Sequence, residues 1–300
     1  MRIAILGNGA WGKGLAFIAE RAGHDVGIWS RRAAQPMLIK SAEAFILAVP
    51  AQDAHGVLQN LDLEGKPLIS AAKGIEKTSG KFLHQLARAV APKSEFYALS
   101  GPSFSADVVQ GLPTAVTLAG PTLEKASHWA KLLSIPTFRI YATDDVAGVE
   151  IGGAMKNVLA IACGISDGLK LGDSARASLT TRGFAELSRF GRKLGAKPET
   201  LMGLSGLGDL LLTCSSQKSR NYSFGRALGQ GQSVAEALGQ AKGVVEGAYT
   251  AGIAAKLARQ HHVEMPIVDA VTAIVDHGSK PGDEVKKLLA RPLGTEFKKE

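Results

Sequence analysis

The sequence predicts an α/β fold, with a mostly parallel, doubly wound sheet at its start and an all-helical region after it. Two observations carry this prediction. Short, nearly continuous apolar runs alternate with helical patterns as far as about residue 143, which is typical of strands covered by helices on both faces. Beyond that point the strand pattern stops and helical periodicity continues alone.

The elements of the first half follow from this alternation. We expect strands at 2–7, 25–29, 44–50, 67–74, 96–102, 114–120 and 138–143. We expect helices between several of them, at 10–22, 52–60, 78–90 and 121–134, and a further helix that begins near Ser103.

The second half contains helical patterns only, with glycines and prolines near their ends. We expect helices at 145–168, 174–195, 199–213, 222–230, 234–241, 246–261, 266–277 and 283–290. The change of pattern predicts a domain boundary near Asp144, with a dinucleotide-binding domain at 1–143 and a helical substrate and catalytic domain at 144–300.

Composition excludes several classes of protein. The net charge is +8, but Lys and Arg are spread along the chain, which disfavours a nucleic-acid-binding tail and suits a small anionic substrate. Cys163 and Cys214 lie in no C-x-x-C or metal-ligand spacing, so we expect two reduced structural thiols and no metal site. We find neither a signal peptide nor an apolar stretch long enough to span a membrane, and therefore expect a cytoplasmic protein.

The segment GNGAWGKG at 7–14 follows the first apolar run and precedes a helix. In this strand–turn–helix context, Gly7 permits the tight turn, Gly9 lets the backbone approach a pyrophosphate, and Gly12 lets the helix pack on the strand. The amides of the helix N-terminus would hold the phosphates. The pattern predicts a Rossmann-type dinucleotide site, against the alternative of an ordinary glycine turn.

The end of the second strand reads IWSRR and carries no carboxylate for a ribose 2′-hydroxyl. Arg31 and Arg32 suit a 2′-phosphate instead, so NADP is favoured over NAD, unless both arginines are merely solvated loop residues.

Six further motifs stand in order along the chain. They are AAKG at 71–74, SGPSFSADV at 100–108, GGAMKNVLAI at 152–161, GLSGLGDLLLTC at 203–214, SRNYSFG at 219–225 and VVEG at 244–247. Together with GNGAWG, they resemble those of bacterial NAD(P)-dependent glycerol-3-phosphate dehydrogenases over nearly the whole chain.

Three of the motif residues could carry chemistry. Lys156 lies in an apolar helical stretch, where desolvation would lower its pKa toward that of a general base, although a lysine at a domain edge is the alternative. Lys73 follows a strand at the edge of the sheet where ligands bind, or is a surface charge. Asp209, flanked by apolar residues, needs a partner if buried, and Lys156 is the natural one; otherwise it caps a helix.

The resemblance implies roles for these and other residues. It implies Lys156 as proton acceptor, with Lys73 and Asp209 completing the catalytic group. It implies a substrate site of Lys73, Gly101, Ser103, Lys156, Asn157, Asp209, Ser219, Arg220 and Asn221. It implies a cofactor site of Gly7, Gly9, Ala10, Trp11, Gly12, Arg31, Arg32, Lys73, Ser105, Arg220, Val244 and Glu246, for NADP or NAD. Ser103, Arg220 and Glu246 could instead be a helix cap, a surface ion pair and an ordinary acid at a helix start.

One departure from the family is clear. Only about a dozen residues, RRAAQPMLIKSAE, separate the second and third predicted strands, where the family carries an additional strand and helix. We expect one strand–helix unit to be missing, which would shorten one side of the sheet and open the adenine pocket.

The resemblance implies interconversion of sn-glycerol 3-phosphate and dihydroxyacetone phosphate for phospholipid synthesis, a small phosphate substrate and a possible homodimer. Two alternatives stay open. One is a related dehydrogenase for a 3-hydroxy acid or a ketopantoate-like substrate, with a carboxylate clamp in place of a phosphate clamp. The other is a non-catalytic dinucleotide sensor.

Overall fold

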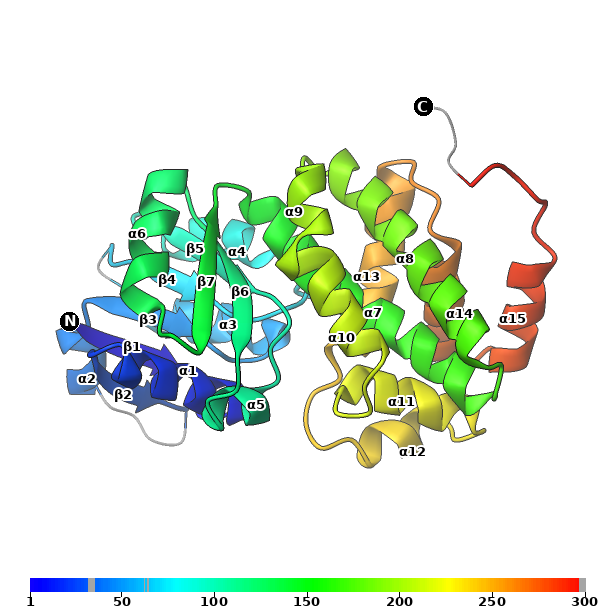
Figure 1. Ribbon diagram of the computed structural model, residues 1–300, viewed down its shortest axis with the longest axis horizontal. Helices are drawn as coiled ribbons and strands as arrows, with labels where there is room; N and C mark the ends of the chain where they lie inside the picture. Colours follow the sequence, from blue (N-terminus) through cyan, green and yellow to red (C-terminus); the bar gives the residue numbers. More distant parts are fainter. Residues whose placement is uncertain (32–35, 62, 64, 297–300) are drawn as a thin grey trace.

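The fold is taken from a computed structural model that describes residues 1–31, 36–61, 63 and 65–296. Figure 1 shows two parts side by side, a sheet flanked by helices and a cluster of helices. The strands are β1 Arg2–Leu6, β2 Asp25–Trp29, β3 Ala44–Leu47, β4 Leu68–Ser70, β5 Phe96–Ser100, β6 Thr114–Ala119 and β7 Phe138–Thr143. The helices among them are α1 Ala10–Arg21, α2 Pro36–Ser41, α3 Ala51–Gln59, α4 Leu83–Val90, α5 Ser105–Val109 and α6 Leu123–Leu133.

The seven strands form one sheet in the order β2-β1-β3-β4-β5-β6-β7. Only β5 and β6 pair antiparallel, so the predicted mostly parallel, doubly wound sheet is confirmed. The third and fourth predicted strands were too long at their carboxyl ends: β3 stops at Leu47 and β4 at Ser70. The chain leaves the sheet at both points, and the loop after β4 carries Lys73.

Alternate side chains of β1 enter different cores. Ile3 and Ile5 pack with α1 and α6 on one face, whereas Ala4 and Leu6 pack with α3 and α4 on the other. This period of two is what a strand buried on both faces requires. Two apolar layers therefore hold the sheet rigid, and its strand ends have fixed positions.

The described part of the first crossover agrees with the predicted shortening. Only the six-residue helix α2 lies there, and β2 is the edge strand among the described residues. In the usual dinucleotide-binding order, a further strand lies outside this position. Arg32 falls outside the described residues.

After β7 the described chain forms helices only, as predicted. They are α7 Val146–Gly168, α8 Asp173–Lys193, α9 Pro198–Met202, the π-helical turn η1 Leu204–Gly208, α10 Asp209–Cys214, α11 Arg220–Gly229, α12 Val234–Gly239, α13 Glu246–Gln260, α14 Pro266–His277 and α15 Pro281–Leu289. The predicted single helix at 199–213 was wrong, because Gly203, Gly206 and Gly208 divide it into α9, η1 and α10. The predicted helix at 78–90 begins only at Leu83.

Helix α7 is the centre of the helical part and is buried along most of its length. It is the one described helix that is long and apolar enough to cross a membrane, with 23 residues and a mean hydropathy of 1.4, against our expectation that no segment reaches this length. Of its most apolar window, 89% is buried inside the protein. Such a helix reads as apolar because other helices surround it.

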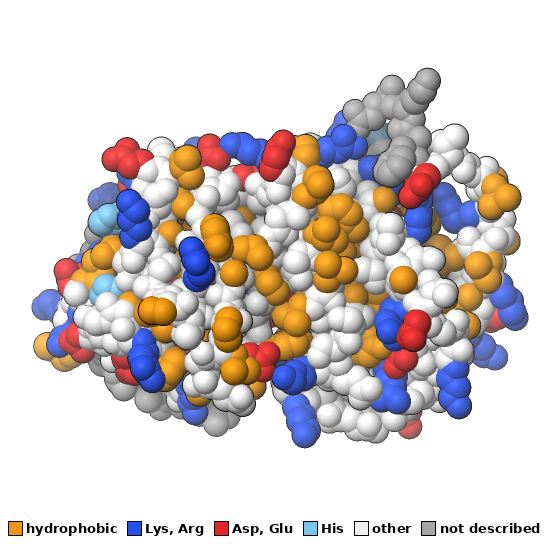
Figure 2. All heavy atoms as spheres, viewed as in Figure 1, with side chains coloured by type: hydrophobic (Ala, Val, Ile, Leu, Met, Phe, Trp, Pro, Cys, Tyr) orange, Lys and Arg blue, Asp and Glu red, His pale blue; other side chains and the backbone are white. Residues whose placement is uncertain are grey.

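Figure 2 shows one face of the molecule, on which basic and acidic side chains are interspersed. The positive net charge does not gather into a continuous stripe on this face, as a nucleic-acid backbone would require.

Candidate active site

Three charged side chains from distant parts of the chain meet in one cluster. The Lys156 Nζ atom lies 2.6 Å from Asp209 Oδ1, and the Lys73 Nζ atom lies 2.7 Å from Asp209 Oδ2. Lys73 Nζ also donates to the carbonyl oxygen of Gly101 at 3.0 Å. One buried carboxylate therefore bridges two lysines, one from the loop after β4 and one from α7.

Glycines let the backbone close around Lys156. A Cβ atom added to Gly152 would lie 2.5 Å from the Ser205 carbonyl oxygen, and one added to Gly153 would lie 2.8 Å from Ser100 Oγ. Larger residues here would hold η1 and β5 away from α7. The two glycines of GGAMK thus leave no side chain on α7 just before Lys156. This lets the elements that carry Asp209 and Lys73 approach the Lys156 amine.

Burial sets the protonation of the cluster. It lowers the pKa of Lys156 to about 8, although the Asp209 carboxylate opposes this shift. Burial alone would raise the pKa of Asp209, but the charges of Lys156 and Lys73 outweigh it and hold that pKa below its ordinary value. An amine that can gain or lose a proton near neutral pH thus stands beside an ionised carboxylate.

Two asparagines connect this cluster to the neighbouring helices. The Asn157 amide donates to the carbonyl oxygens of Lys73 at 3.1 Å and Gly153 at 3.3 Å. Asn221 donates to Asn157 Oδ1 at 2.9 Å and accepts from the Gly247 amide at the same distance. Both predicted substrate residues are buried here in protein hydrogen bonds, which fix the loop of Lys73 against α11 and α13.

The loop after β5 lies on the same side of the cluster. Gly101 has a φ of +147°, and an added Cβ there would lie 2.8 Å from Val116 Cα, so the tight turn needs glycine. Ser103 Oγ donates to the Gly101 carbonyl oxygen at 3.0 Å, the same oxygen that Lys73 contacts. Ser105 opens α5 and lies against Gly14 of α1, which joins this loop to the glycine turn.

The glycine turn fits a dinucleotide pyrophosphate. Gly7 has a φ of +133°, and an added Cβ at Gly12 would lie 2.0 Å from the Gly7 carbonyl oxygen. Gly9 has open space beside it, with nothing within 4 Å of an added Cβ. Helix α1 starts at Ala10 and Trp11 with no side chain capping it. The amides of the helix N-terminus are therefore available to an anion.

The remaining predicted cofactor residues are not all in one place. Arg31 lies at the end of β2, paired with Asp53 of α3. Glu246, the first residue of α13, accepts a hydrogen bond from the Ala51 amide at 3.0 Å and so joins the helical part to the start of α3. Burial raises the pKa of Glu246 to about 7, because it outweighs that hydrogen bond and the charge of Arg220.

Arg220 is exposed at the start of α11, next to Gly243 and the loop that carries Val244. An added Cβ at Gly243 would lie 2.8 Å from Arg220 Nη1. Ser219 caps the same helix by accepting from the Tyr222 amide at 3.2 Å. The guanidinium thus lies beside the loop of Gly243 and Val244, exposed at the helix start rather than buried.

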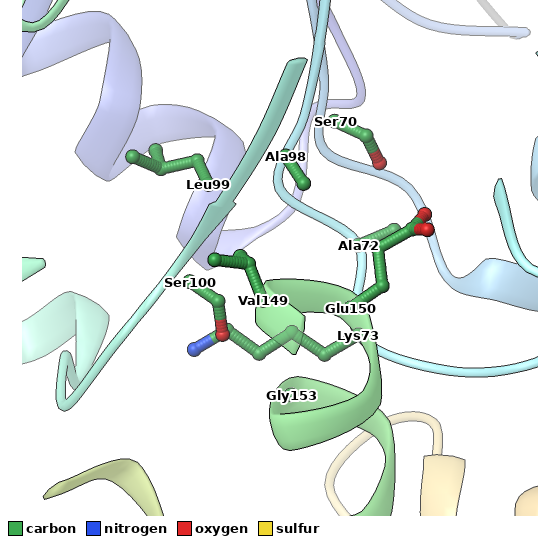
Figure 3. Close-up of a pocket in the computed structure, with 9 residues that line it drawn as sticks. All are labelled: Ser70, Ala72, Lys73, Ala98, Leu99, Ser100, Val149, Glu150 and Gly153. Atoms are coloured by element: carbon green, nitrogen blue, oxygen red, sulfur yellow. The ribbon is translucent and has the colours of Figure 1, made fainter. Parts of the chain in front are cut away.

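A small cavity of about 10 Å³ lies beside Lys73, a size that holds one water molecule. Figure 3 shows the Lys73 amine and the Glu150 carboxylate toward opposite sides of it. Two hydroxyls that line it, Ser70 Oγ and Ser100 Oγ, have no hydrogen-bond partner among the described residues. The cavity is too small for a substrate and belongs to the packing behind the cluster.

Sequence reasoning missed one contact of the site and one ion pair of α7 near it. Thr213 Oγ1 accepts a hydrogen bond from Lys156 Nζ at 3.0 Å. Its spacing of four residues from Asp209 places both on one helix face and could have revealed it. His84 pairs with Glu150 of α7, and nothing in the sequence links these two residues.

Both cysteines lie in the part of the chain that the structure describes. Cys163 and Cys214 are both free and buried. No group of three His, Cys, Asp or Glu side chains in that part could hold a metal ion.

Comparison with known proteins identifies the family of the chain. The family model described as the NAD-dependent glycerol-3-phosphate dehydrogenase C-terminus matches residues 145–286. The corresponding N-terminus model matches residues 2–42 and 36–126. The chain belongs to the NAD-dependent glycerol-3-phosphate dehydrogenase family.

Individual members of this family resemble the chain over nearly its full length. It is 46% identical to glycerol-3-phosphate dehydrogenase [NAD(P)+] of Parvibaculum lavamentivorans, covering 98% of both chains. It is 48% identical to the enzyme of the same name from Methylobacterium radiotolerans, covering 97% of both. The crystal structure of glycerol-3-phosphate dehydrogenase from Coxiella burnetii superposes with a TM-score of 0.90 at 35% identity, over 97% of this chain and 99% of that one.

The comparisons also bear on the short crossover. The N-terminus model of the dehydrogenase family matches in two separate stretches, which overlap at residues 36–42, in and just after α2. The alignment with the Parvibaculum enzyme has 326 positions, more than the 300 residues of this chain, so it includes positions that this chain lacks. Both findings fit a segment of the family fold that is reduced here.

Proposed function

We propose that this chain interconverts sn-glycerol 3-phosphate and dihydroxyacetone phosphate with NAD(P)H. The observation that carries the proposal is the bridge of Lys73 and Lys156 by one buried Asp209 carboxylate. The bridge lies where the loops after β4 and β5 meet α7, and a Rossmann-type glycine turn opens the same chain. Its chemistry is that of a proton donor and acceptor next to a redox cofactor.

Lys156 is the proposed general acid and base. In the reduction it gives a proton to the carbonyl oxygen as that oxygen gains charge, and in the oxidation it removes the hydroxyl proton. Bound NAD(P)H supplies the hydride. Asp209 stabilises the protonated amine and fixes its direction, and Lys73 adds positive charge toward the reacting oxygen.

We assign the substrate phosphate to the start of α11. Arg220 is exposed there, and its planar guanidinium can hold two phosphate oxygens while the Ser219 hydroxyl donates to the phosphate. Ser103 contributes its hydroxyl in this proposal by turning it away from the Gly101 carbonyl oxygen. Asn157 and Asn221 act in this proposal chiefly as positioning residues, because protein atoms already occupy their amide groups. The Gly101 turn holds Lys73 in place.

We assign the cofactor to the glycine turn, Ser105 and the segment of Val244 and Glu246. Arg31 at the end of β2 favours NADPH, because a guanidinium binds a 2′-phosphate and no carboxylate stands at that position of the strand end. In this proposal residues 1–143 bind the dinucleotide and residues 144–300 complete the catalytic site. Service in phospholipid synthesis, a cytoplasmic location and a homodimer are further expectations from the family resemblance.

The test is steady-state kinetics with dihydroxyacetone phosphate, run in parallel with NADH and NADPH. Non-phosphorylated ketones and 2-oxo acids serve as competing substrates. A clear preference for the phosphorylated ketone supports the proposal, whereas a preference for an acid would favour the related dehydrogenases. Binding of the dinucleotide without turnover of any ketone would favour a sensor.

A further inference from the structure

Arg31 and Asp53 form an ion pair at the cofactor edge of the sheet. Arg31 follows β2, and Asp53 lies in the first turn of α3, which follows β3. The Arg31 Nη2 and Asp53 Oδ1 atoms are 3.2 Å apart. Strands β2 and β3 flank β1, whose carboxyl end carries the glycine turn. The ion pair therefore lies beside the glycine turn, where the adenosine half of the proposed dinucleotide would bind.

The two partners differ in how firmly they are held. The Arg31 side chain is 71% exposed and the Asp53 side chain 34% exposed. Asp53 is fixed by its place in a helix whose first turn favours a negative charge. Arg31 sits on a strand end, so it is the partner that can turn toward a ligand.

A 2′-phosphate needs the same guanidinium that Asp53 already contacts. Exposed ion pairs contribute little to stability, so this pair can open. Opening it still leaves a carboxylate without its partner next to an incoming anion. A 2′-hydroxyl makes no such demand, because it is neutral.

We propose that Asp53 is a specificity-determining residue that competes with the cofactor's 2′-phosphate for Arg31 and so narrows the affinity difference between NADPH and NADH. The inference rests on the proposed use of Arg31 for NADPH. It goes beyond that use, because it places a carboxylate on α3 where the strand end itself has none.

Asp53 has a second electrostatic neighbour that the test must separate. Its charge also acts on Glu246, the carboxylate that binds the Ala51 amide at the start of the same helix. An effect of Asp53 that ran through Glu246 would change the affinities for both cofactors alike. The ratio of the two affinities is therefore the decisive quantity.

The experiment measures equilibrium binding, without turnover, on the full chain. Isothermal titration calorimetry gives dissociation constants for NADPH, NADH, ADP-ribose and 2′-phospho-ADP-ribose with the wild type, Asp53→Asn, Arg31→Gln and the double variant. Asp25→Asn is the matched control, because Asp25 forms a comparable exposed pair with Arg2, at 2.6 Å. Asp53→Ser replaces Asp53→Asn if the latter does not fold, since it also removes the carboxylate and leaves a small polar side chain.

We expect Asp53→Asn to raise the affinity for NADPH and for 2′-phospho-ADP-ribose about five-fold, and to leave the affinities for NADH and ADP-ribose unchanged. The gain should vanish in the Arg31→Gln background. An unchanged NADPH to NADH ratio, or an equal gain in the absence of Arg31, would overturn the proposal. If Arg31→Gln leaves NADPH binding intact, the proposed cofactor preference fails instead, which is a separate outcome.

Discussion

Lys156 and Asp209 form an ion pair of 2.6 Å in which both side chains are almost wholly buried. Removing one partner of such a pair leaves an uncompensated buried charge. A buried ion pair adds little net stability, so its presence is better explained by a catalytic role. Because the second oxygen of Asp209 also binds Lys73, the carboxylate organises two cations at once. The roles of the two lysines and of the carboxylate can therefore be tested separately.

Lys156→Ala should lower kcat for reduction of dihydroxyacetone phosphate by a factor on the order of 10³, since it removes the proposed proton donor. Lys156→Arg should not restore the rate, because a guanidinium keeps its proton at all working pH values. Both variants are assayed by NADPH oxidation, and NADPH binding is measured on each as a control for folding. Activity near the wild-type level in Lys156→Ala would contradict the assignment.

The pH dependence should differ in sign between the two directions. The pKa of Lys156 is lowered to about 8, so the amine is mainly protonated below that pH and mainly neutral above it. Reduction needs the protonated form, and its kcat/KM should fall as pH rises through about 8. Oxidation of glycerol 3-phosphate needs the neutral form, and its kcat/KM should rise through the same pH. The measurement is initial rates in both directions in a series of overlapping buffers.

Glu246→Gln is the control for those profiles, because burial raises the pKa of Glu246 to about 7 and places a second titration nearby. The variant should lose any limb centred near 7 and keep the limb near 8. Loss of the limb near 8 would mean that Lys156 is not the group observed.

Asn221→Ala should destabilise the fold by roughly 1–3 kcal/mol, because it leaves the Gly247 amide and Asn157 Oδ1 buried without their partner. Urea unfolding measures the change. Asn60→Ala is the matched control, since Asn60 makes one exposed hydrogen bond to Gly56 and should cost little. A stability change no larger than that of the control would show that the hydrogen bonds of Asn221 do not stabilise the packing of α7, α11 and α13.

Much of this could be predicted from the sequence, and the reason is physical. The predicted limits of β2 and β7 match the observed strands, and those of β1 match to within one residue, because glycines, charged residues and prolines interrupt the apolar pattern beside them. The pairing of Lys156 with Asp209 was also accessible, because a buried acid needs a cation.

Other features depend on tertiary contacts and could not be predicted. The break of one predicted helix into α9, η1 and α10 makes Asp209 the first residue of α10, which local periodicity does not reveal. The contact between Arg31 and Asp53 joins residues 22 positions apart on different elements. The buried hydrogen bonds of Asn157 and Asn221 depend on helices that meet only in the folded protein.

Gly9, Gly12 and Gly14, in the glycine turn and the start of α1, allow effects on cofactor binding to be separated from effects on stability. An added Cβ at Gly9 meets no atom within 4 Å, and the residue has a φ of −80°, which alanine adopts without strain. Gly9→Ala should therefore leave the stability unchanged. It should weaken NADPH binding by roughly an order of magnitude, because the methyl group would occupy the space of the pyrophosphate. Gly14→Ala is the control for binding, since its Cβ would make ordinary contacts of 3.6 Å with Trp11; it should leave NADPH binding unchanged and raise stability by up to about 1 kcal/mol, because alanine favours the helix interior. Gly12→Ala should reduce both stability and binding, because its Cβ would lie 2.0 Å from the Gly7 carbonyl oxygen. Thermal unfolding and calorimetric titration of the three variants distinguish these cases. If Gly9→Ala bound NADPH as well as Gly14→Ala does, the pyrophosphate would have to lie elsewhere.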